Sequence, residues 1–195
     1  MKVGLFFGSF NPIHIGHMII ANIMCETTDL DKVWFVVSPQ NPLKRNKNLL
    51  HEFDRIQMVE AAIADNYKLK CTDIEFRMPK PSYTVDTMTY LSDKTQDKKF
   101  VLIIGEDNFL TFDKWKNYQA ILENFELYVY PRPGAKQSAL IKNSNVKKIE
   151  APVLNISATF IRSCVSKNQS IRYLVPDPVA KLIDLKCYYK SAAKL

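Results

Sequence analysis

Short apolar runs recur along this chain, and segments with helical periodicity lie between most of them. The apolar runs cover residues 3–7, 32–37, 69–74, 100–104, 125–130 and, more weakly, 146–149. Helical patterns cover residues 18–24, 54–64, 84–91 and 118–122. Short strands that alternate with helices are typical of a parallel sheet covered on both faces. The pattern therefore predicts an α/β protein with a doubly wound, mostly parallel sheet and helices on both faces.

The length of the chain limits its domain organisation. With 195 residues, the chain can form one domain with a full hydrophobic core, and it contains no internal repeat. We expect a single domain over residues 1–195, with a C-terminal helical part, about residues 157–195, packed on it. The segments 39–50 and 135–145 are polar and predict loops, which in a compact domain are often functional.

A turn with two glycines and two histidines joins the first predicted strand to the first predicted helix. Residues 8–17 read GSFNPIHIGH. The first N–H groups of a helix lack partners, and open α/β sheets bind phosphates at this kind of turn. Gly8 would let a ligand approach the backbone and can adopt a positive φ, while Gly16 leaves the first helical turn open to a flat group such as a ribose. The turn therefore predicts a phosphate-binding site.

The two histidines of this turn are candidates for stabilising an anion. His14 and His17 lie three residues apart, so they share one helical face. A neutral imidazole donates one hydrogen bond and a protonated one donates two, which suits an anion that gains charge during a reaction. Paired histidines also commonly bind zinc. The HExxH spacing is absent and the third histidine, His51, begins a different helix, so we predict no metal site.

A second predicted helix N-terminus lies near the end of the chain. Ser157 precedes a helical pattern, and a serine at that position is ordinarily an N-cap. Together with Thr159 and Arg162, it would also form an anion cradle, because a helix N-terminus needs few further groups to hold phosphate. Asp107 follows the run 100–104, and two roles remain open for it. It would be a helix N-cap or a ligand for ribose hydroxyls.

Two motifs at opposite ends of the chain resemble the signatures of the nucleotidyltransferase superfamily. Residues 8–17 resemble its (T/H)xGH motif, and residues 156–163, ISATFIRS, resemble its ISSTxIR motif. Within the superfamily, similarity to the nicotinate mononucleotide adenylyltransferases is carried by residues 81–87, 105–107 with Trp115, 130–134 and 173–179. The sequence departs from the pattern at Asn11, Ala158 and Glu106, where aspartate, serine and a small residue are common.

The resemblance implies a Rossmann-like fold and an adenylyl transfer. Such an enzyme would join nicotinate mononucleotide to ATP and release pyrophosphate and nicotinate adenine dinucleotide, a precursor of NAD. The attacking phosphate is already an anion at neutral pH, so the reaction needs aligned hydrogen-bond donors and cations and no general base. Because the chain has no recognisable carboxylate cage, Mg²⁺ would arrive on ATP with most of its waters.

The resemblance also implies roles for particular residues. For catalysis these are His14, His17, Lys44 and Arg162. For ATP binding they are Gly8, Ser9, Phe10, His14, Gly16, His17, Gly105, Asp107, Ile156, Ser157, Thr159 and Arg162. For mononucleotide binding they are Ser9, Lys44, Tyr83, Thr84, Trp115, Lys116 and Arg132. Arg45 is an alternative to Lys44, and Arg132 would otherwise brace the end of a strand. Arg55 is expected to be a solvated or ion-paired helix residue.

Other functions remain open at this point. A nicotinamide mononucleotide or phosphopantetheine adenylyltransferase would share the phosphate-binding motifs. The phosphopantetheine alternative leaves the segments around Tyr83 and Trp115 without a role. In a different class, the chain would be a nucleotide-binding regulator without catalysis, although such a protein has less need of groups that stabilise developing charge.

Composition bears on partners and location. The net charge of +7 and pI near 9.1 favour anionic partners such as nucleotides, and no block of five like charges indicates a nucleic-acid-binding tail. The four cysteines form no CxxC pair, so we expect free thiols rather than disulfides. No secretory signal and no run of eighteen apolar residues is present, so we expect no membrane contact and a cytoplasmic location. A homo-oligomer remains open.

Overall fold

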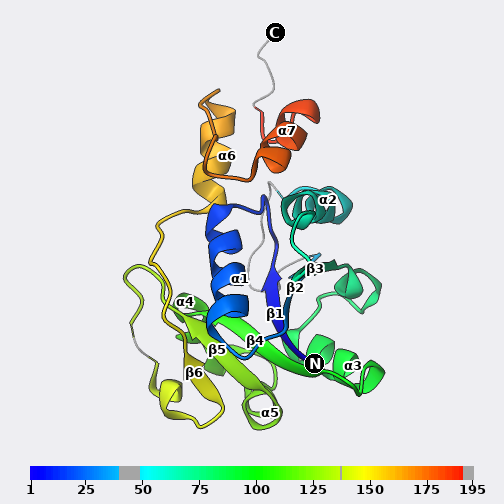
Figure 1. Cartoon of the computed structure of the whole chain (residues 1–195), viewed down its shortest axis with the longest axis vertical. Coiled ribbons are helices and arrows are strands. Elements are labelled where there is room, and N and C mark those ends of the chain that lie inside the picture. Colours follow the sequence, from blue (N-terminus) through cyan, green and yellow to red (C-terminus); the bar gives the residue numbers. More distant parts are fainter. Residues whose placement is uncertain (40–48, 137, 191–195) are drawn as a thin grey trace.

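The fold is built around a single parallel sheet. The computed structural model describes residues 1–39, 49–136 and 138–190 (Figure 1). The strands are β1 (Lys2–Gly8), β2 (Lys32–Val37), β3 (Leu69–Thr72), β4 (Lys99–Gly105), β5 (Glu126–Tyr130) and β6 (Val146–Lys148). They form a six-stranded sheet in the order β3-β2-β1-β4-β5-β6, and every neighbouring pair is parallel. The predicted α/β class with a mostly parallel sheet is confirmed.

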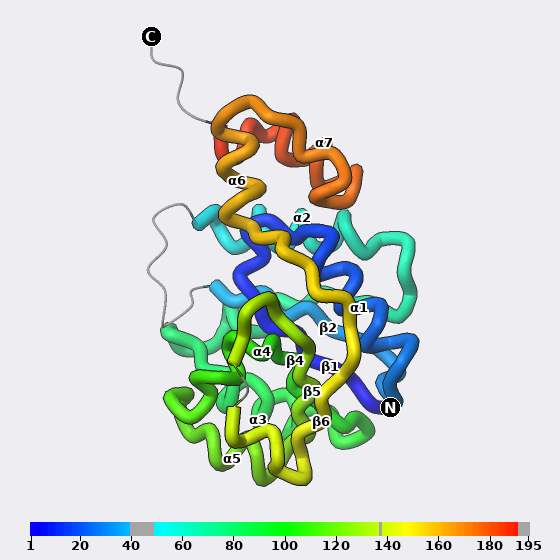
Figure 2. The backbone as a smooth tube through the Cα atoms, turned by 90° about the vertical axis from the view of Figure 1, so that its left-hand side faces the viewer, coloured from blue at the N-terminus to red at the C-terminus, as the bar shows by residue number. Residues whose placement is uncertain are grey.

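Helices connect the strands and also follow the last one. The α-helices are α1 (Ile15–Thr27), α2 (Glu52–Ile63), α3 (Thr84–Lys94), α4 (Glu106–Phe109), α5 (Tyr118–Asn124), α6 (Ala158–Ser166) and α7 (Asp177–Leu185). Short 3₁₀ helices are η1 (Ile74–Arg77), η2 (Phe112–Lys114) and η3 (Ala139–Lys142). Figures 1 and 2 agree that α6 and α7 lie together at one end of the molecule, next to α2.

The alternation of side chains along the strands divides the core into two layers. In β1, Phe6 belongs to one buried cluster and Leu5 to the other, because successive side chains of a strand point to opposite faces. The first cluster includes residues of α1, α2, α6 and α7, and the second includes residues of α3 and α5. The two C-terminal helices therefore share a core with α1 and α2. The first motif, residues 8–17, ends in the first turn of α1.

The order of the strands places a binding position next to β1. After β1 the chain adds β2 and β3 on one side, and it then returns to add β4, β5 and β6 on the other. In open parallel sheets, ligands bind beyond the carboxyl ends of the strands at the point where this order reverses. Gly8 and Gly105 end β1 and β4, the two strands that meet there. The fold therefore predicts a site between the segments that follow these two glycines.

Most element boundaries shift by one to three residues from the sequence prediction, and two segments show a difference of another kind. The strand predicted over residues 69–74 ends at Thr72, whose hydroxyl accepts a hydrogen bond from the N–H of Ile74 at 3.3 Å and turns the chain into η1. The loop predicted over residues 135–145 contains the 3₁₀ helix η3. A local side-chain contact decides the first difference, and hydrophobic periodicity does not report such contacts.

The cysteines and the lengths of the helices bear on the expectations from composition. All four cysteines are free, and Cys25 and Cys164 are buried in the helices α1 and α6. Across residues 1–39, 49–136 and 138–190, no helix is long and apolar enough to span a bilayer.

Candidate active site

The turn between β1 and α1 is shaped by Phe10. This residue has a φ of 45°, in the left-handed region, and its ring covers Gly8. A Cβ atom on Gly8 would lie 2.8 Å from that ring, so no larger residue fits without displacing it. The positive φ expected of Gly8 thus falls on Phe10 instead. A bulky residue holds this conformation only where its surroundings enforce it, and such enforced backbone is typical of ligand-binding turns.

The two histidines of the first motif are stacked and oriented. Their ring centroids lie 3.6 Å apart at an interplanar angle of 24°. The Nδ1 atom of His17 accepts a hydrogen bond from the backbone N–H of His14 at 3.2 Å. In a neutral imidazole, one nitrogen accepts and the other carries the proton, so Nε2 of His17 is a hydrogen-bond donor. His17 also lies edge-on to Phe6 and Phe10, which fix the plane of its ring.

Both imidazoles are neutral at pH 7. Burial, followed by the positive charge of Arg132, lowers the pKa of His14 to about 4. Burial, the neighbouring His14 and Arg132 hold the pKa of His17 well below its ordinary value. The Nδ1 atom of His14 is buried and has no hydrogen-bond partner in the described part of the chain. A buried polar atom without a partner is unfavourable, and in this turn it is available to a ligand.

Gly16 allows the close approach of a neighbouring ring. A Cβ atom there would lie 3.1 Å from Nδ1 of His14 and 3.2 Å from Cε1 of the same ring. The space that a side chain at Gly16 would take is therefore occupied by the His14 imidazole, and the predicted contact of Gly16 with a ribose stays a prediction. The glycine allows the stacked arrangement of the two histidines at the start of α1.

The second motif reaches the first directly. Ser157 is the N-cap of α6, and its hydroxyl accepts a hydrogen bond from the N–H of Phe160 at 3.2 Å. Arg162 donates from Nη1 to the carbonyl oxygen of Asn11 at 2.8 Å and from Nη2 to the hydroxyl of Thr159 at 3.1 Å. The two motifs, 151 residues apart along the chain at this contact, therefore meet. The N-cap alternative for Ser157 is correct, and it leaves the residue at the edge of the pocket described next.

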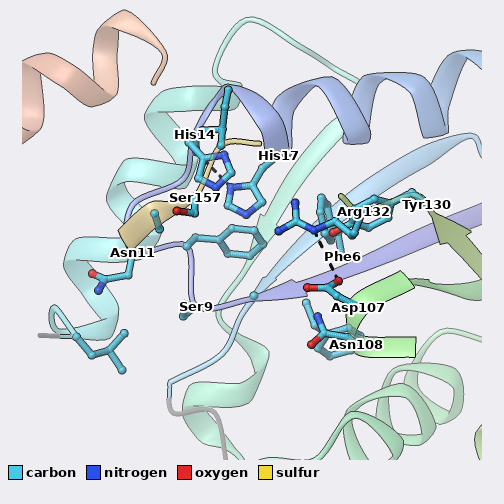
Figure 3. Close-up of a pocket in the computed structure, with 16 residues that line it drawn as sticks. Phe6, Ser9, Asn11, His14, His17, Asp107, Asn108, Tyr130, Arg132 and Ser157 are labelled. Carbon is cyan, nitrogen blue, oxygen red and sulfur yellow. Dashed lines mark hydrogen bonds and ion pairs between the residues drawn. The ribbon is translucent and has the colours of Figure 1, made fainter. Parts of the chain in front are cut away.

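A pocket of about 270 Å³ lies between the two motifs (Figure 3). Of the predicted residues, its walls contain Gly8, Ser9, Phe10, His14, His17, Asp107, Arg132, Ile156 and Ser157. The sequence reasoning did not assign Phe6, Phe7, Asn11, Leu49, Asn108, Tyr130 and Ala158, which complete the lining. Thr159 and Arg162 do not line the pocket, and Arg162 donates instead to the carbonyl of Asn11, which does. Figure 3 shows the imidazoles of His14 and His17 facing Arg132 and Asp107 across the pocket.

Arg132 and Asp107 form the wall opposite the histidines. Arg132 Nε lies 3.6 Å from Oδ1 of Asp107, and the backbone N–H of Arg132 donates to the Glu106 carboxylate at 3.3 Å. Gly105, not Asp107, is the N-cap residue of α4, so the N-cap alternative for Asp107 is wrong. A Cβ atom on Gly105 would lie 2.6 Å from the Asp107 carboxylate, which packs over the end of β4. Asp107 thus remains a candidate for ribose hydroxyls, and Arg132 a candidate for phosphate.

The residues predicted to read the mononucleotide base lie outside this pocket wall. Tyr83 is the N-cap residue of α3, and Lys116 Nζ lies 4.6 Å from the centre of its ring. Lys116 also pairs with Asp86 at 2.9 Å, and the Trp115 ring packs against Phe112 with centroids 5.2 Å apart. These contacts bring Tyr83 and Lys116 together. Their role in binding the mononucleotide stays a prediction. Lys44 and Arg45 lie outside the described residues.

Arg55 is the main residue that the sequence interpretation missed. The expectation of a solvated or ion-paired residue is wrong, because the side chain is completely buried. Arg55 donates to four backbone carbonyl oxygens, those of Ser9 (2.6 Å), Ser38 (2.7 Å), Pro39 (2.9 Å) and Leu50 (3.0 Å). It therefore ties the first motif to the segments on either side of residues 40–48. Its position on α2 gave a signal, since it shares the buried stripe of Met58, Val59 and Ala62.

The lowered pKa values of the two histidines should make the free energy of unfolding depend on pH. His14 has a pKa of about 4 in the folded state, whereas in the unfolded chain it binds a proton below about pH 6.5. Between these values the unfolded state binds more protons, so stability falls as the pH drops from 6.5 to 4. For His14 alone we expect a loss of about 3 kcal/mol by pH 4. His17 acts in the same direction.

Urea unfolding of the wild type and of His14→Ala between pH 7 and pH 4 measures this effect. The variant should lose distinctly less stability across this window than the wild type. Acid-sensitive carboxylates do not confuse the comparison, because they are the same in both proteins. One example is Asp29, whose pKa is lowered to about 2 by hydrogen bonds from Lys2 and Tyr128. Parallel pH profiles for the two proteins would contradict the assignment of His14 as a buried neutral histidine.

Comparisons with known proteins give a consistent result. Residues 5–164 match the family model described as cytidylyltransferase-like. A Cytophaga hutchinsonii protein named "probable nicotinate-nucleotide adenylyltransferase" is 61% identical over 191 residues, which cover 98% of this chain and 100% of that protein. A protein of the same name from Flavobacterium psychrophilum is 49% identical over 193 residues, covering 98% of this chain and 100% of that protein.

Solved structures resemble the fold at much lower identity. Plasmodium falciparum nicotinic acid mononucleotide adenylyltransferase complexed with NaAD aligns with a TM-score of 0.82 and 18% identity, covering 96% of this chain and 97% of that chain. The same enzyme complexed with APC aligns with a TM-score of 0.81 and 17% identity, covering 96% of both chains. At this identity the structural likeness establishes the Rossmann-like fold alone.

Proposed function

The chain belongs to the nicotinate-nucleotide adenylyltransferase family, and we propose that its pocket joins nicotinate mononucleotide to ATP by direct in-line attack. The phosphate of the mononucleotide attacks the α-phosphorus of ATP, the bond to the β-phosphate breaks, and pyrophosphate leaves. The products are nicotinate adenine dinucleotide, a precursor in NAD biosynthesis, and pyrophosphate. No covalent intermediate with the protein and no general base are needed, because the attacking phosphate is an anion at neutral pH.

The meeting of the two motifs carries this proposal. Arg162 binds the Asn11 carbonyl, and Ser157, at the start of α6, lines the same pocket as His14 and His17, at the start of α1. A triphosphate between them would face the positive ends of two helix dipoles. A single polyanion that reaches both turns is therefore the ligand that suits this pocket best.

His17 is the group best placed to stabilise charge that develops during the transfer. Its ring is oriented before any ligand binds, because the His14 N–H occupies Nδ1 and Phe6 and Phe10 flank the ring. Nε2 can then donate to the leaving pyrophosphate without reorganisation, which is the condition under which such donors are most effective. Arg132, on the opposite wall, would supply a full positive charge to the reacting phosphates.

The mononucleotide is proposed to extend from this pocket toward the start of α3. Ser9 and Arg132 would contact its phosphate, while Tyr83, Thr84, Trp115 and Lys116 would surround its pyridine ring. Trp115 is partly exposed, so its indole is accessible for stacking on an electron-poor ring. Lys44 keeps its predicted role as a phosphate contact.

Mg²⁺ is proposed to enter as part of the ATP substrate. In the described ranges, no group of three or more His, Cys, Asp or Glu side chains is arranged to hold a metal ion. This donor set fits a cation that is bound mainly by phosphate oxygens and water, which is the usual state of Mg²⁺ on a nucleotide. When bound, the ion neutralises part of the charge of the leaving pyrophosphate.

A substrate panel tests the proposed function. Pyrophosphate release is measured with ATP and, in turn, nicotinate mononucleotide, nicotinamide mononucleotide and phosphopantetheine. We expect the highest kcat/KM with nicotinate mononucleotide. A preference for nicotinamide mononucleotide or phosphopantetheine would overturn the substrate assignment. Tight ATP binding without release from any of the three would instead favour a nucleotide-binding regulator.

A further inference from the structure

A buried carboxylate lies beneath the segment that precedes α3. Glu75, in η1, is 2% exposed. Its Oε2 accepts a hydrogen bond from the hydroxyl of Ser82 at 2.9 Å, and its Oε1 accepts one from the hydroxyl of Thr87 at 2.8 Å. The hydroxyl of Ser38 is a third donor. In the described part of the chain its partners are hydroxyl groups, and no ion pair involves it.

This arrangement is unfavourable for stability by itself. Burial raises the pKa of Glu75 even though three hydroxyl groups donate to the carboxylate. A buried carboxyl group without a cation is expensive to desolvate, and an apolar residue of similar size would fill the same space at lower cost. The contacts of Glu75 therefore indicate a role in fixing the positions of its three donors.

The donors of Glu75 lie on both sides of the turn at Tyr83 and Thr84. Ser82 directly precedes this turn, and Thr87 is in the first turn of α3, where its hydroxyl also contacts the carbonyl oxygen of Tyr83 at 3.3 Å. Tyr83 occupies the N-cap position but provides no side-chain cap to the helix. The start of α3 therefore has no side-chain N-cap, and Glu75 binds the hydroxyls of Ser82 and Thr87 on either side of it.

The third donor connects this turn to the first motif. The Ser38 hydroxyl donates to Glu75, while the Ser38 carbonyl accepts from Arg55 at 2.7 Å. The same Nη1 atom of Arg55 donates to the carbonyl of Ser9 at 2.6 Å. A line of hydrogen bonds thus runs from the turn that precedes α3, through Ser38, which directly follows β2, to the turn that follows β1.

We propose that Glu75 is a positioning residue for mononucleotide recognition, which holds the Tyr83–Thr84 turn at a fixed place relative to the phosphate pocket. The inference rests on the proposed function, because it takes this turn to contact the pyridine mononucleotide. Glu75 itself touches no substrate. Its loss should weaken mononucleotide binding selectively, since the Ser82 and Thr87 contacts belong to the turn and not to the two motifs that face ATP.

Three variants test this proposal. Glu75→Gln keeps the size of the side chain but removes its charge and replaces one acceptor oxygen with a donor, so a hydroxyl that donated to that oxygen must lose or reverse its hydrogen bond. Thr87→Val removes a single hydroxyl at nearly constant shape. Thr95→Val is the matched control, because its hydroxyl contacts the carbonyl of Leu91 at 2.6 Å at the opposite end of α3. For each variant, KM for nicotinate mononucleotide, KM for ATP, kcat and Tm are measured.

The result expected is a split between the two Michaelis constants. Glu75→Gln and Thr87→Val should raise KM for the mononucleotide by up to about tenfold, the effect of one lost hydrogen bond, with KM for ATP within about twofold of the wild type. Thr95→Val should leave both constants unchanged. A fall in Tm with both constants unchanged, or an equal rise in both, would overturn the positioning role.

The controls separate this inference from the function on which it rests. If Glu75→Gln does not fold, Thr87→Val alone decides, and an unchanged KM for the mononucleotide in that variant overturns the proposal. Absence of turnover by the wild type with nicotinate mononucleotide and ATP would reject the proposed function. Normal wild-type turnover with unaffected variants would reject only the role of Glu75.

Discussion

Replacing His17 with alanine should lower kcat for pyrophosphate release by about 10²- to 10³-fold, the usual effect of removing one preorganised donor to a developing anion. The reason is the fixed position of this ring. Its Nδ1 atom accepts a hydrogen bond from the His14 N–H, and the rings of Phe6 and Phe10 pack edge-on against the imidazole. The Nε2 donor is therefore held at a fixed position in the pocket. Because the donor matters most for charge that appears during the reaction, KM for both substrates should change much less than kcat.

The third histidine provides the matched control for this substitution. His51 is at the N-terminus of α2, where its exposed ring accepts a hydrogen bond from the N–H of Phe53 at 3.4 Å. His51→Ala removes a helix cap, for which we expect a loss of about 1 kcal/mol in stability and turnover within about twofold of the wild type. Wild-type kcat in a folded His17→Ala protein would remove His17 from the mechanism.

Replacing Arg55 with methionine should destabilise the fold by about 3 kcal/mol. The substitution keeps an unbranched, flexible side chain but removes the guanidinium. It leaves the carbonyls of Ser9, Ser38, Pro39 and Leu50 without their shared donor. Each buried acceptor without a partner costs about 1–3 kcal/mol. Part of this loss is offset because the variant no longer bears the cost of desolvating a buried guanidinium. That cost is also seen in the pKa of Arg55, which burial lowers.

Urea unfolding at pH 7 measures the change at Arg55, with Arg77→Met as the control. The Arg77 side chain is 80% exposed and forms a single surface contact with Asp73 at 3.3 Å, so its loss should change stability by less than about 0.5 kcal/mol. An Arg55→Met protein with wild-type stability would show that these carbonyls find other partners. Because Ser9 belongs to the first motif, we also expect turnover to fall in a variant that folds.

Much of the fold follows from the apolar runs of the sequence. The run over residues 100–104 is apolar throughout because β4 is a central strand between β1 and β5 and is covered on both faces. The weak run over residues 146–149 corresponds to β6 at the edge, where Lys147 and Lys148 are exposed. The strand that was predicted too long shows the limit of this reasoning, because the Thr72 hydroxyl turned the chain where the hydrophobic pattern continued.

The candidate site was predictable only in part, and the reason is the range of its contacts. His14, His17 and Ser157 lie in local motifs whose turn chemistry is visible in the sequence. The contact of Arg162 with the Asn11 carbonyl spans 151 residues, and the hydrogen bond from the Tyr189 hydroxyl to the Asn11 side chain spans 178. No local pattern reports contacts of that range.

Contacts of side chains with backbone carbonyl oxygens could also not be predicted from motifs. Arg55 is bound to carbonyl oxygens, which every residue carries, so no partner residue type in the sequence marks its role. The stripe that it shares with Met58 and Ala62 indicated burial, but a charged residue in a stripe is ordinarily solvated. The contact of Gly16 with the ring of His14, two residues earlier, could likewise not be placed from spacing alone.

The most direct test of the account is a crystal structure with nicotinate mononucleotide and a non-cleavable ATP analogue. The account predicts one triphosphate in the pocket of Figure 3, with oxygens about 3 Å from Nε2 of His17 and, at the same time, from the hydroxyl or backbone N–H groups of the turn that begins at Ser157. Phosphates bound at only one of these two turns, or elsewhere on the molecule, would contradict it.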